Sequence, residues 1–255
     1  MQGIAPEPSP DAVLWRYMSF AKFVGMLTQK GLYMRRADGF ADKWEAAIGP
    51  AEFRPQYEQA MKGAMQKMID SDEEAALDLS PEQREEVVSN LVNQVAELNR
   101  KVRINTFISC WHEANHESEA MWKLYSFDSA EGVAIVTDCR TLKKAIPKKY
   151  SLEIGTVQYR DPGVGPSGPL HRFFYKRPAF KHEQEVRLLY LREDTEPGED
   201  LGLVIPMMLN RMIHYVVISP YAPKWVFDAT VEVCKRFNLK APVHSSALGD
   251  EPFHF

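Results

Sequence analysis

The sequence predicts an α+β fold, with a mixed, largely antiparallel sheet core and an inserted pair of helices. Short apolar runs suited to strands alternate with helical patterns along most of the chain. A 3.6-residue apolar period replaces them at residues 50–103. The 255 residues are 45% hydrophobic, enough to bury the core of one domain. We therefore expect a loose lead at residues 1–12 and a single domain at 13–255, with 50–103 as a helical insert.

The first elements after the lead are short. The run "VLWRYMS" at 13–19 predicts a strand, and "FAKFVGMLTQKG" at 20–31 predicts a helix. Gly31 is expected to end that helix, because glycine is the usual residue just past a helix C-terminus. "LYMRR" predicts a second strand, followed by a turn and a short helix at 39–50.

The insert has the pattern of two helices joined by an acidic loop at residues 70–80. The first helix has apolar residues at helical spacing: Phe53, Tyr57, Ala60, Met61, Ala64, Met65 and Met68. The second helix is expected to start at Ser80, with proline next and Gln83 placed to complete a capping box. Its apolar positions are Val87, Val88, Leu91, Val95, Leu98 and Val102.

The remaining chain returns to strands with helices between them. Strands are expected at residues 104–111, 131–138, 153–161, 185–192, 201–206 and 213–220. Helices are expected at residues 117–127, 140–146 and 223–237. The sequence "PGVGPSGP" at 162–169 predicts a loop.

Composition narrows the class of protein. A formal net charge of -4 gives no overall footprint for binding polyanions. No apolar run approaches the roughly 20 residues that span a bilayer, and the N-terminal residues lack the pattern of a signal peptide. The three cysteines have no CxxC spacing, which favours a reduced, cytoplasmic protein. We therefore expect a cytoplasmic protein without a membrane partner.

The string "HEANH", from His112 to His116, matches the HExxH pattern of zinc hydrolases. On a helix, its two histidines would lie one turn apart and hold Zn²⁺ while the glutamate activates water. Here the string directly follows a predicted strand and contains Asn115, a residue typical of turns and caps. We therefore expect a polar loop and no bound metal, and keep a zinc hydrolase as an alternative.

The segment "KHEQEVRLLYL" at 181–191 places three charged residues on one face of a predicted strand, namely Glu183, Glu185 and Arg187. One interpretation is an edge strand with a ladder of compensating charges. The other is an acidic pair in a cleft, which could bind ribose hydroxyls and stabilise an oxocarbenium-like centre. Arg16, in the middle of the first strand, would pair with a carboxylate or bind phosphate.

Four sequence blocks carry a resemblance to a large bacterial family catalogued as a domain of unknown function. They are the run from Leu14 to Glu45, "CWHEANHESEAMWKLYS", "FKHEQEVRL" and "ISPYAPKW", and they extend over nearly the whole chain. The middle block, with Ser118, Met121, Trp122 and Tyr125, is the most specific. The family label itself implies no activity.

The order of elements also resembles the layout of ADP-ribosyltransferases. In the Arg-Ser-Glu branch a first-strand arginine contacts NAD, a middle-strand serine shapes the pocket, and an E-x-E pair carries the catalytic glutamate second. The resemblance implies these roles for Arg16, Ser109 and the pair Glu183 and Glu185. Glu185 would bind the nicotinamide ribose and stabilise its oxocarbenium form, and Glu183 would orient the acceptor. The Ser-Thr-Ser signature of that branch is absent.

The resemblance implies an NAD-consuming ADP-ribosyltransferase, with NAD as substrate and no metal. The NAD site would include Arg16, Tyr17, Ser109, Trp122 and Tyr125, although the last two aromatics could equally be core residues. A toxin or phage-defence effector would act on a protein or nucleic-acid acceptor and could have an antitoxin or other partner protein. The alternatives are a non-catalytic binding or accessory protein on the same scaffold and the zinc hydrolase.

Overall fold

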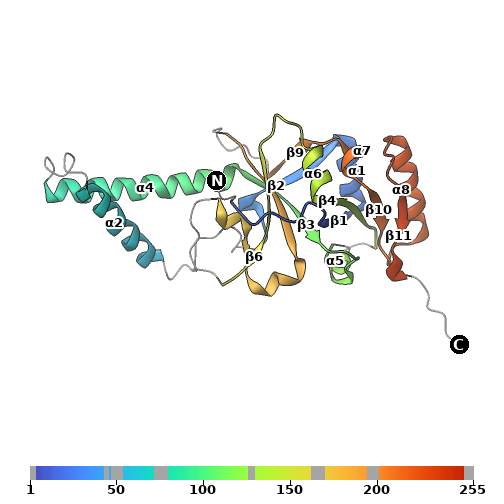
Figure 1. The fold of residues 1–255 in the computed structure, drawn as a ribbon, viewed down its shortest axis with the longest axis horizontal. Coiled ribbons are helices and arrows are strands. Elements are labelled where there is room, and N and C mark those ends of the chain that lie inside the picture. Colours follow the sequence, from blue (N-terminus) through green and yellow to red (C-terminus); the bar gives the residue numbers. More distant parts are fainter. Residues whose placement is uncertain are drawn as a thin grey trace.

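The structure, a computed structural model, describes residues 4–42, 46, 54–71, 80–125, 130–161, 170–193 and 201–249. Within these residues a nine-stranded sheet forms the centre of the molecule (Figure 1). Its strands are β1 (Val13–Ser19), β2 (Gly31–Arg36), β3 (Thr106–Glu113), β4 (Gly132–Asp138), β5 (Leu152–Thr156), β8 (Glu185–Leu191), β9 (Gly202–Pro206), β10 (Tyr215–Ile218) and β11 (Val243–Ser245).

The sheet is mixed and largely antiparallel, which confirms the predicted fold class. Seven strands follow the order β11-β10-β4-β1-β3-β2-β9, while β8 pairs with β3 and β5 pairs with β8. Only β10 and β11 are parallel among the pairs of this sheet that the structure describes. A separate parallel pair joins β6 (Gln158–Tyr159) to β7 (Tyr175–Lys176).

Strand β3 organises the sheet because three strands pair with it. On one side β8 follows it from Thr106 to His112. On the other side β1 pairs with it at His112 and Glu113, and β2 pairs with it at Phe107 and Ile108. Residues 109–111 therefore lie between two pairings, and the sheet splits there.

Helices cover both faces of the sheet. Helices α1 (Phe20–Gln29), α6 (Cys139–Ala145), α7 (Leu209–Met212) and α8 (Lys224–Arg236) contribute to one buried cluster with Leu14 and Met18 of β1. Helix α5 (Glu119–Tyr125) packs against Trp15 and Tyr17 of the same strand. Because alternate residues of a strand point to opposite faces, the two clusters lie on opposite sides of the sheet.

The end of α1 differs from the prediction. The left-handed residue that caps the helix is Lys30, with φ 50°, and Gly31 already belongs to β2. A glycine is nevertheless needed at position 31, since a Cβ there would lie 2.5 Å from the carbonyl oxygen of Ile205 on β9. Close approach of β9, and not a helix stop, explains this glycine.

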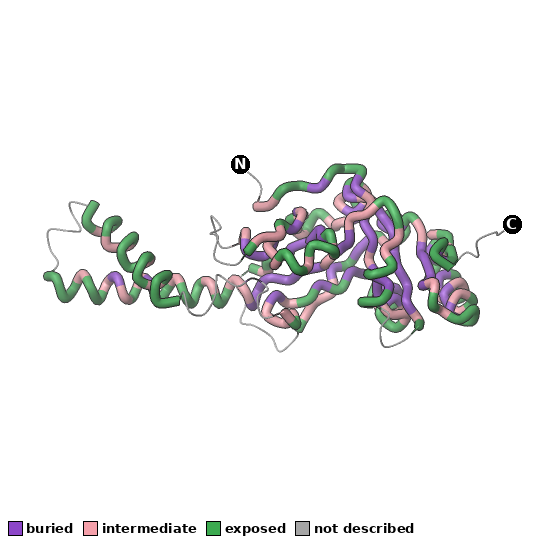
Figure 2. Tube along the Cα trace, turned by 90° about the horizontal axis from the view of Figure 1, so that it is seen from below, coloured by how far each residue is buried: buried purple, intermediate pink, exposed green. Residues whose placement is uncertain are grey.

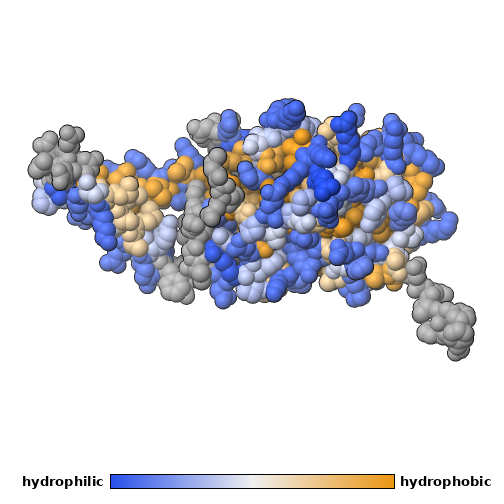
Figure 3. All heavy atoms as spheres, viewed as in Figure 1, coloured by the Kyte–Doolittle hydropathy of each residue, from blue (hydrophilic) through white to orange (hydrophobic). Residues whose placement is uncertain are grey.

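Two helices form an arm that extends away from the sheet (Figures 1 and 2). They are α2 (Arg54–Ser71) and α4 (Pro81–Asn105), and the predicted capping box at Ser80 and Gln83 is present. Helix α4 continues directly into β3. Val88 and Val92 of α4 are buried, whereas none of the described side chains of α2 is, and apolar side chains remain on the surface of the arm (Figure 3).

The predicted loose lead makes contacts with the domain in residues 4–12. The carbonyl of Pro6 accepts a hydrogen bond from Thr156, and Asp11 pairs with Arg140 at 2.9 Å. The predicted short helix at 39–50 and the loops at 70–80 and 162–169 lie largely or wholly outside the described residues. Helices long and apolar enough to cross a membrane are not found in the described part of the chain.

Candidate functional site

A pocket of about 470 Å³ lies at the split in the sheet. Its wall includes residues 15–18 of β1, Tyr33 and Arg35 of β2, and residues 110–112 of β3. Lys22 of α1 and Tyr125 of α5 also reach it. The volume is in the usual range for small-molecule sites, which is roughly 300–1,000 Å³.

Arg16 bridges the split from β1. Its guanidinium donates to the hydroxyl of Ser109 on β3 and, at 2.8 Å, to the carbonyl of Tyr33 on β2. Burial lowers the pKa of Arg16, but an arginine keeps its charge at neutral pH. Arg16 therefore ties three strands together and presents a positive charge to the pocket. Ser109 is buried and contacts Arg16 without lining the pocket itself.

Aromatic side chains form one wall of the pocket. Tyr17 and Tyr125 both line it and stack with ring centroids 6.4 Å apart. The hydroxyl of Tyr17 accepts a hydrogen bond from the backbone of Ser118, and burial raises its pKa to about 12. Trp122 lies behind this wall, fully buried against Tyr17 with centroids 4.7 Å apart. It is therefore a core residue that supports the wall.

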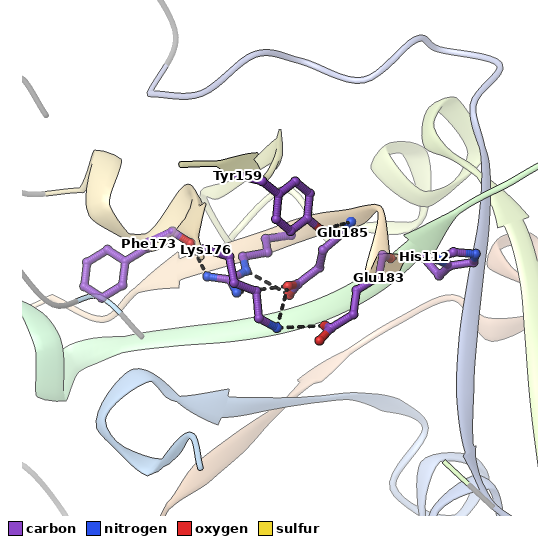
Figure 4. Close-up of polar contacts among 7 residues, drawn as sticks. His112, Tyr159, Phe173, Lys176, Glu183 and Glu185 are labelled. Carbon is purple, nitrogen blue, oxygen red and sulfur yellow. Dashed lines mark hydrogen bonds and ion pairs between the residues drawn. The ribbon is translucent and has the colours of Figure 1, made fainter. Parts of the chain in front are cut away.

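The charged segment departs from the predicted strand. Glu183 ends a 3-10 helix, η4 (Pro178–Glu183), and Gln184 adopts a left-handed conformation with φ 39°. Strand β8 begins only at Glu185, so the three charged residues do not share one face of a strand. The turn at Gln184 nevertheless brings both carboxylates together, because each contacts the ammonium of Lys176 (Figure 4).

Glu185 is buried and forms a two-pronged ion pair with Arg187. The Nε of Arg187 donates to Oε1 at 2.8 Å and its Nη2 donates to Oε2 at 3.0 Å. Burial alone would raise the pKa of Glu185, but the charge and hydrogen bonds of Arg187, together with Lys176, lower it to about 2. Glu185 is therefore the buried partner of an ion pair and is not exposed in an open cleft. Glu185 still reaches the pocket wall.

The backbone around the two carboxylates is also held in place. Nδ1 of His112 lies 2.6 Å from the carbonyl of Glu183, and a carbonyl can only accept, so Nδ1 carries the proton. The amide of Glu185 donates to the hydroxyl of Tyr159 at 2.8 Å. Burial lowers the pKa of His112, which favours its neutral form.

The geometry around "HEANH" differs from that of a zinc helix. His112 and Glu113 belong to β3, residues 114–118 are not helical, and α5 begins only at Glu119. The described residues hold no group of three His, Cys, Asp or Glu side chains placed to bind a metal ion. The two histidines of the string therefore lack the one-turn spacing that HExxH chemistry requires.

Three important residues of this site were not singled out from the sequence as site residues: Lys176, Tyr159 and Trp111. Lys176 and Tyr159 come from the small β6–β7 sheet, where they are direct partners. Trp111 lines the pocket, and its indole nitrogen has no hydrogen-bond partner among the described residues. No periodicity or motif marks the first two, since two-residue strands leave no pattern in the sequence.

We predict that Glu185→Gln lowers the free energy of unfolding at pH 7 by about 3 kcal/mol or more, because it leaves Arg187 buried without its charge partner. This corresponds to a melting temperature lower by roughly 6 °C or more. Since the folded-state pKa lies below the ordinary 4.5, the difference from wild type should be full above pH 4.5 and vanish as the pH falls toward 2. Thermal melts across this pH range measure it.

Glu153→Gln is the matched control, because Glu153 is an exposed residue on the neighbouring strand β5. It should change stability by less than about 0.5 kcal/mol. Equal melting temperatures for Glu185→Gln and wild type would contradict the structural role of the ion pair.

We also predict that truncating Trp122 to alanine lowers the stability of the protein much more than truncating Tyr125. Trp122→Ala should cost about 3–5 kcal/mol of stability, since the side chain is 0% exposed. Tyr125→Ala should cost about 1 kcal/mol, since the side chain is 42% exposed. Urea denaturation of both variants provides the comparison, and similar losses would show that both rings are core residues.

Comparisons with known proteins give distant structural likenesses. No family model matches the chain, and no curated protein does. Thermus sp. 2.9 DarT in complex with NAD+ is 9% identical, with a TM-score of 0.42, and covers 96% of this chain and 100% of its own. The complex with ADP-ribosylated ssDNA is 8% identical, with a TM-score of 0.41, and covers 94% of this chain and 96% of its own. These likenesses assign no role to any residue of this chain.

Proposed function

We propose that the protein transfers ADP-ribose from NAD to a nucleophile on a macromolecule. The observation that carries this proposal is one pocket with positive side chains on one side and two carboxylates on the other. NAD has the matching distribution of charge, with an anionic pyrophosphate and a cationic nicotinamide ring. Aromatic walls of the kind formed by Tyr17 and Tyr125 suit a flat ring between these charges.

The register of the sheet separates the two sides of the pocket. Arg35 pairs with Ile108, whereas Glu185 pairs with His112 on the same strand. Four residues along a strand correspond to about 13 Å. Arg16 contacts Ser109, near the arginine side of this interval, and Lys22 adds a further positive charge to the wall. Phosphate oxygens would bind at this side, where guanidinium groups can donate in pairs.

The carboxylate side suits the reaction centre. As the bond between the ribose C1′ and the nicotinamide nitrogen breaks, nicotinamide leaves with the electron pair and positive charge develops on the ribose. A fixed carboxylate placed against that charge stabilises it more than it stabilises the ground state. The acceptor then bonds to C1′ and gives up its proton. The indole N–H of Trp111, which has no hydrogen-bond partner among the described residues, is a donor that a polar substrate group would satisfy.

The opening of the pocket suits a large acceptor. Tyr33 and Tyr125 both line the pocket and are 45% and 42% exposed, so aromatic surface extends from the pocket to solvent. Exposed rings of this kind can stack on a base or pack against a peptide. In the proposed role, the protein is a toxin or phage-defence effector whose activity an antitoxin or other partner protein would restrain.

Release of nicotinamide from NAD tests the activity. Purified protein is incubated with NAD alone and with cell extract, and samples of the extract are first treated with protease, DNase or RNase. We expect turnover that rises with extract and is lost with the one treatment that destroys the acceptor. If wild type releases no nicotinamide and NAD does not raise its melting temperature, the proposal fails. A higher melting temperature with NAD but no release of nicotinamide would support the alternative of a non-catalytic binding protein.

Arg16 gives a prediction for substrate binding. Arg16→Ala should raise KM for NAD by roughly 10-fold or more and lower kcat less, because a phosphate contact acts in ground and transition states alike. Arg16→Lys keeps the charge but loses the planar guanidinium, so its KM should lie between those of wild type and Arg16→Ala. Lys224→Ala, an exposed substitution on α8, is the control and should leave KM unchanged. A larger loss in kcat than in 1/KM for Arg16→Ala would contradict this role.

A further inference from the structure

Four charged side chains form a ladder of alternating charge that leads from the core to the pocket. Arg187 pairs with Glu185 at 2.8 Å, and Glu185 contacts Lys176 at 3.4 Å. Lys176 in turn pairs with Glu183 at 2.7 Å. Figure 4 shows the carboxylates of Glu183 and Glu185 turned toward the lysine between them. The order of charges is therefore plus, minus, plus, minus.

Exposure rises steadily along this ladder. The side chains of Arg187 and Glu185 are 0% and 3% exposed, whereas those of Lys176 and Glu183 are 11% and 17% exposed. The ladder thus starts in the core and ends with Glu183, which lines the pocket. Of the four side chains, Glu183 is therefore the one that a substrate entering the pocket could contact with the least movement of its neighbours.

The oxygens of the two carboxylates are used differently. Both oxygens of Glu185 accept from Arg187, and Oε2 also contacts Lys176. Lys176 contacts Oε2 of Glu183, and no contact to Oε1 is found among the described residues. Oε1 of Glu183 therefore keeps its acceptor capacity. Each carboxylate thus contacts a cation, but Glu185 does so through both oxygens and Glu183 through Oε2.

Glu183 is also fixed at both its backbone and its side chain. His112 holds its carbonyl, and the left-handed Gln184 turns the chain directly after it. Lys176 comes from β7, which pairs with β6, and Tyr159 of β6 binds the amide of Glu185. The small sheet therefore anchors the same turn through Lys176, which contacts both carboxylates, and through Tyr159, which accepts from the amide of Glu185. Such fixed geometry is what a preorganised electrostatic group requires.

We propose that Glu183 is the catalytic carboxylate of the pocket and that Lys176 is its positioning residue, held by the buried Glu185–Arg187 pair. This inference rests on the proposed function and moves the catalytic role from Glu185, to which the resemblance assigns it, to Glu183. Oε1 of Glu183 faces the positive charge that develops on the ribose when nicotinamide leaves with the bonding electron pair. When the acceptor bonds to C1′, its proton passes to this carboxylate and then to solvent.

A double-mutant cycle tests both parts. Glu183→Gln should lower kcat for nicotinamide release on the order of 10²-fold or more, with the melting temperature within about 2 °C of wild type. Lys176→Met should lower kcat by roughly 10-fold and leave KM within about twofold. Because Lys176 acts through Glu183, adding Lys176→Met to Glu183→Gln should lower kcat no further.

Two further variants sharpen the cycle. Lys176→Arg keeps a cation on β7 and should restore part of the kcat that Lys176→Met loses. Lys181→Met removes an exposed lysine from the neighbouring helix η4 and should leave kcat and KM unchanged. This control separates the specific contact from a general loss of positive charge.

The outcomes distinguish this inference from the activity itself. A wild type that never consumes NAD overturns the proposed function, and this inference falls with it. An active wild type with a Glu183→Gln variant that keeps more than half of its kcat overturns the inference alone. Fully multiplicative losses in the double variant would show that Lys176 does not act through Glu183.

Discussion

The buried ion pair between Glu185 and Arg187 holds together the elements on the carboxylate side of the pocket. Removing two charges from water is costly, and the pair is stable only if each remaining donor and acceptor is satisfied. Arg187 therefore also donates to the carbonyl of Phe173, and Lys176 contacts Glu185. These contacts lock β8, the 3-10 helix η3 (His171–Phe174) and the β6–β7 sheet into one unit. This unit fixes the position of Glu185, which lines the pocket.

The split in the sheet is the second requirement for the pocket. An uninterrupted sheet would fill this space with paired backbone. Here the same edge of β3 pairs with β1 at one end and with β2 at the other. Arg16 stabilises the opening by donating to both neighbouring strands. The same guanidinium thus holds the pocket open and supplies charge to it, which links the stability of the split to its chemistry.

Periodic elements could be predicted from the sequence, whereas the contacts that build the site could not. The 3.6-residue pattern and the capping box at Ser80 predicted both helices of the arm, because these signals are local. The charged segment was predicted as one strand, but the left-handed Gln184 breaks it, and nothing in its side chain requires that conformation. Lys176 reaches the carboxylates only through tertiary pairing. Arg16 was identified from its position on an otherwise apolar strand.

In the proposed complex the pocket binds NAD with the reaction centre at Glu183 and the phosphates at Arg16. A crystal structure of the protein with a non-hydrolysable NAD analogue tests this most directly. We expect the nicotinamide ribose within hydrogen-bond distance of Oε1 of Glu183 and the pyrophosphate against the guanidinium of Arg16. An analogue bound outside the split in the sheet, or bound with its ribose away from both glutamates, would contradict it.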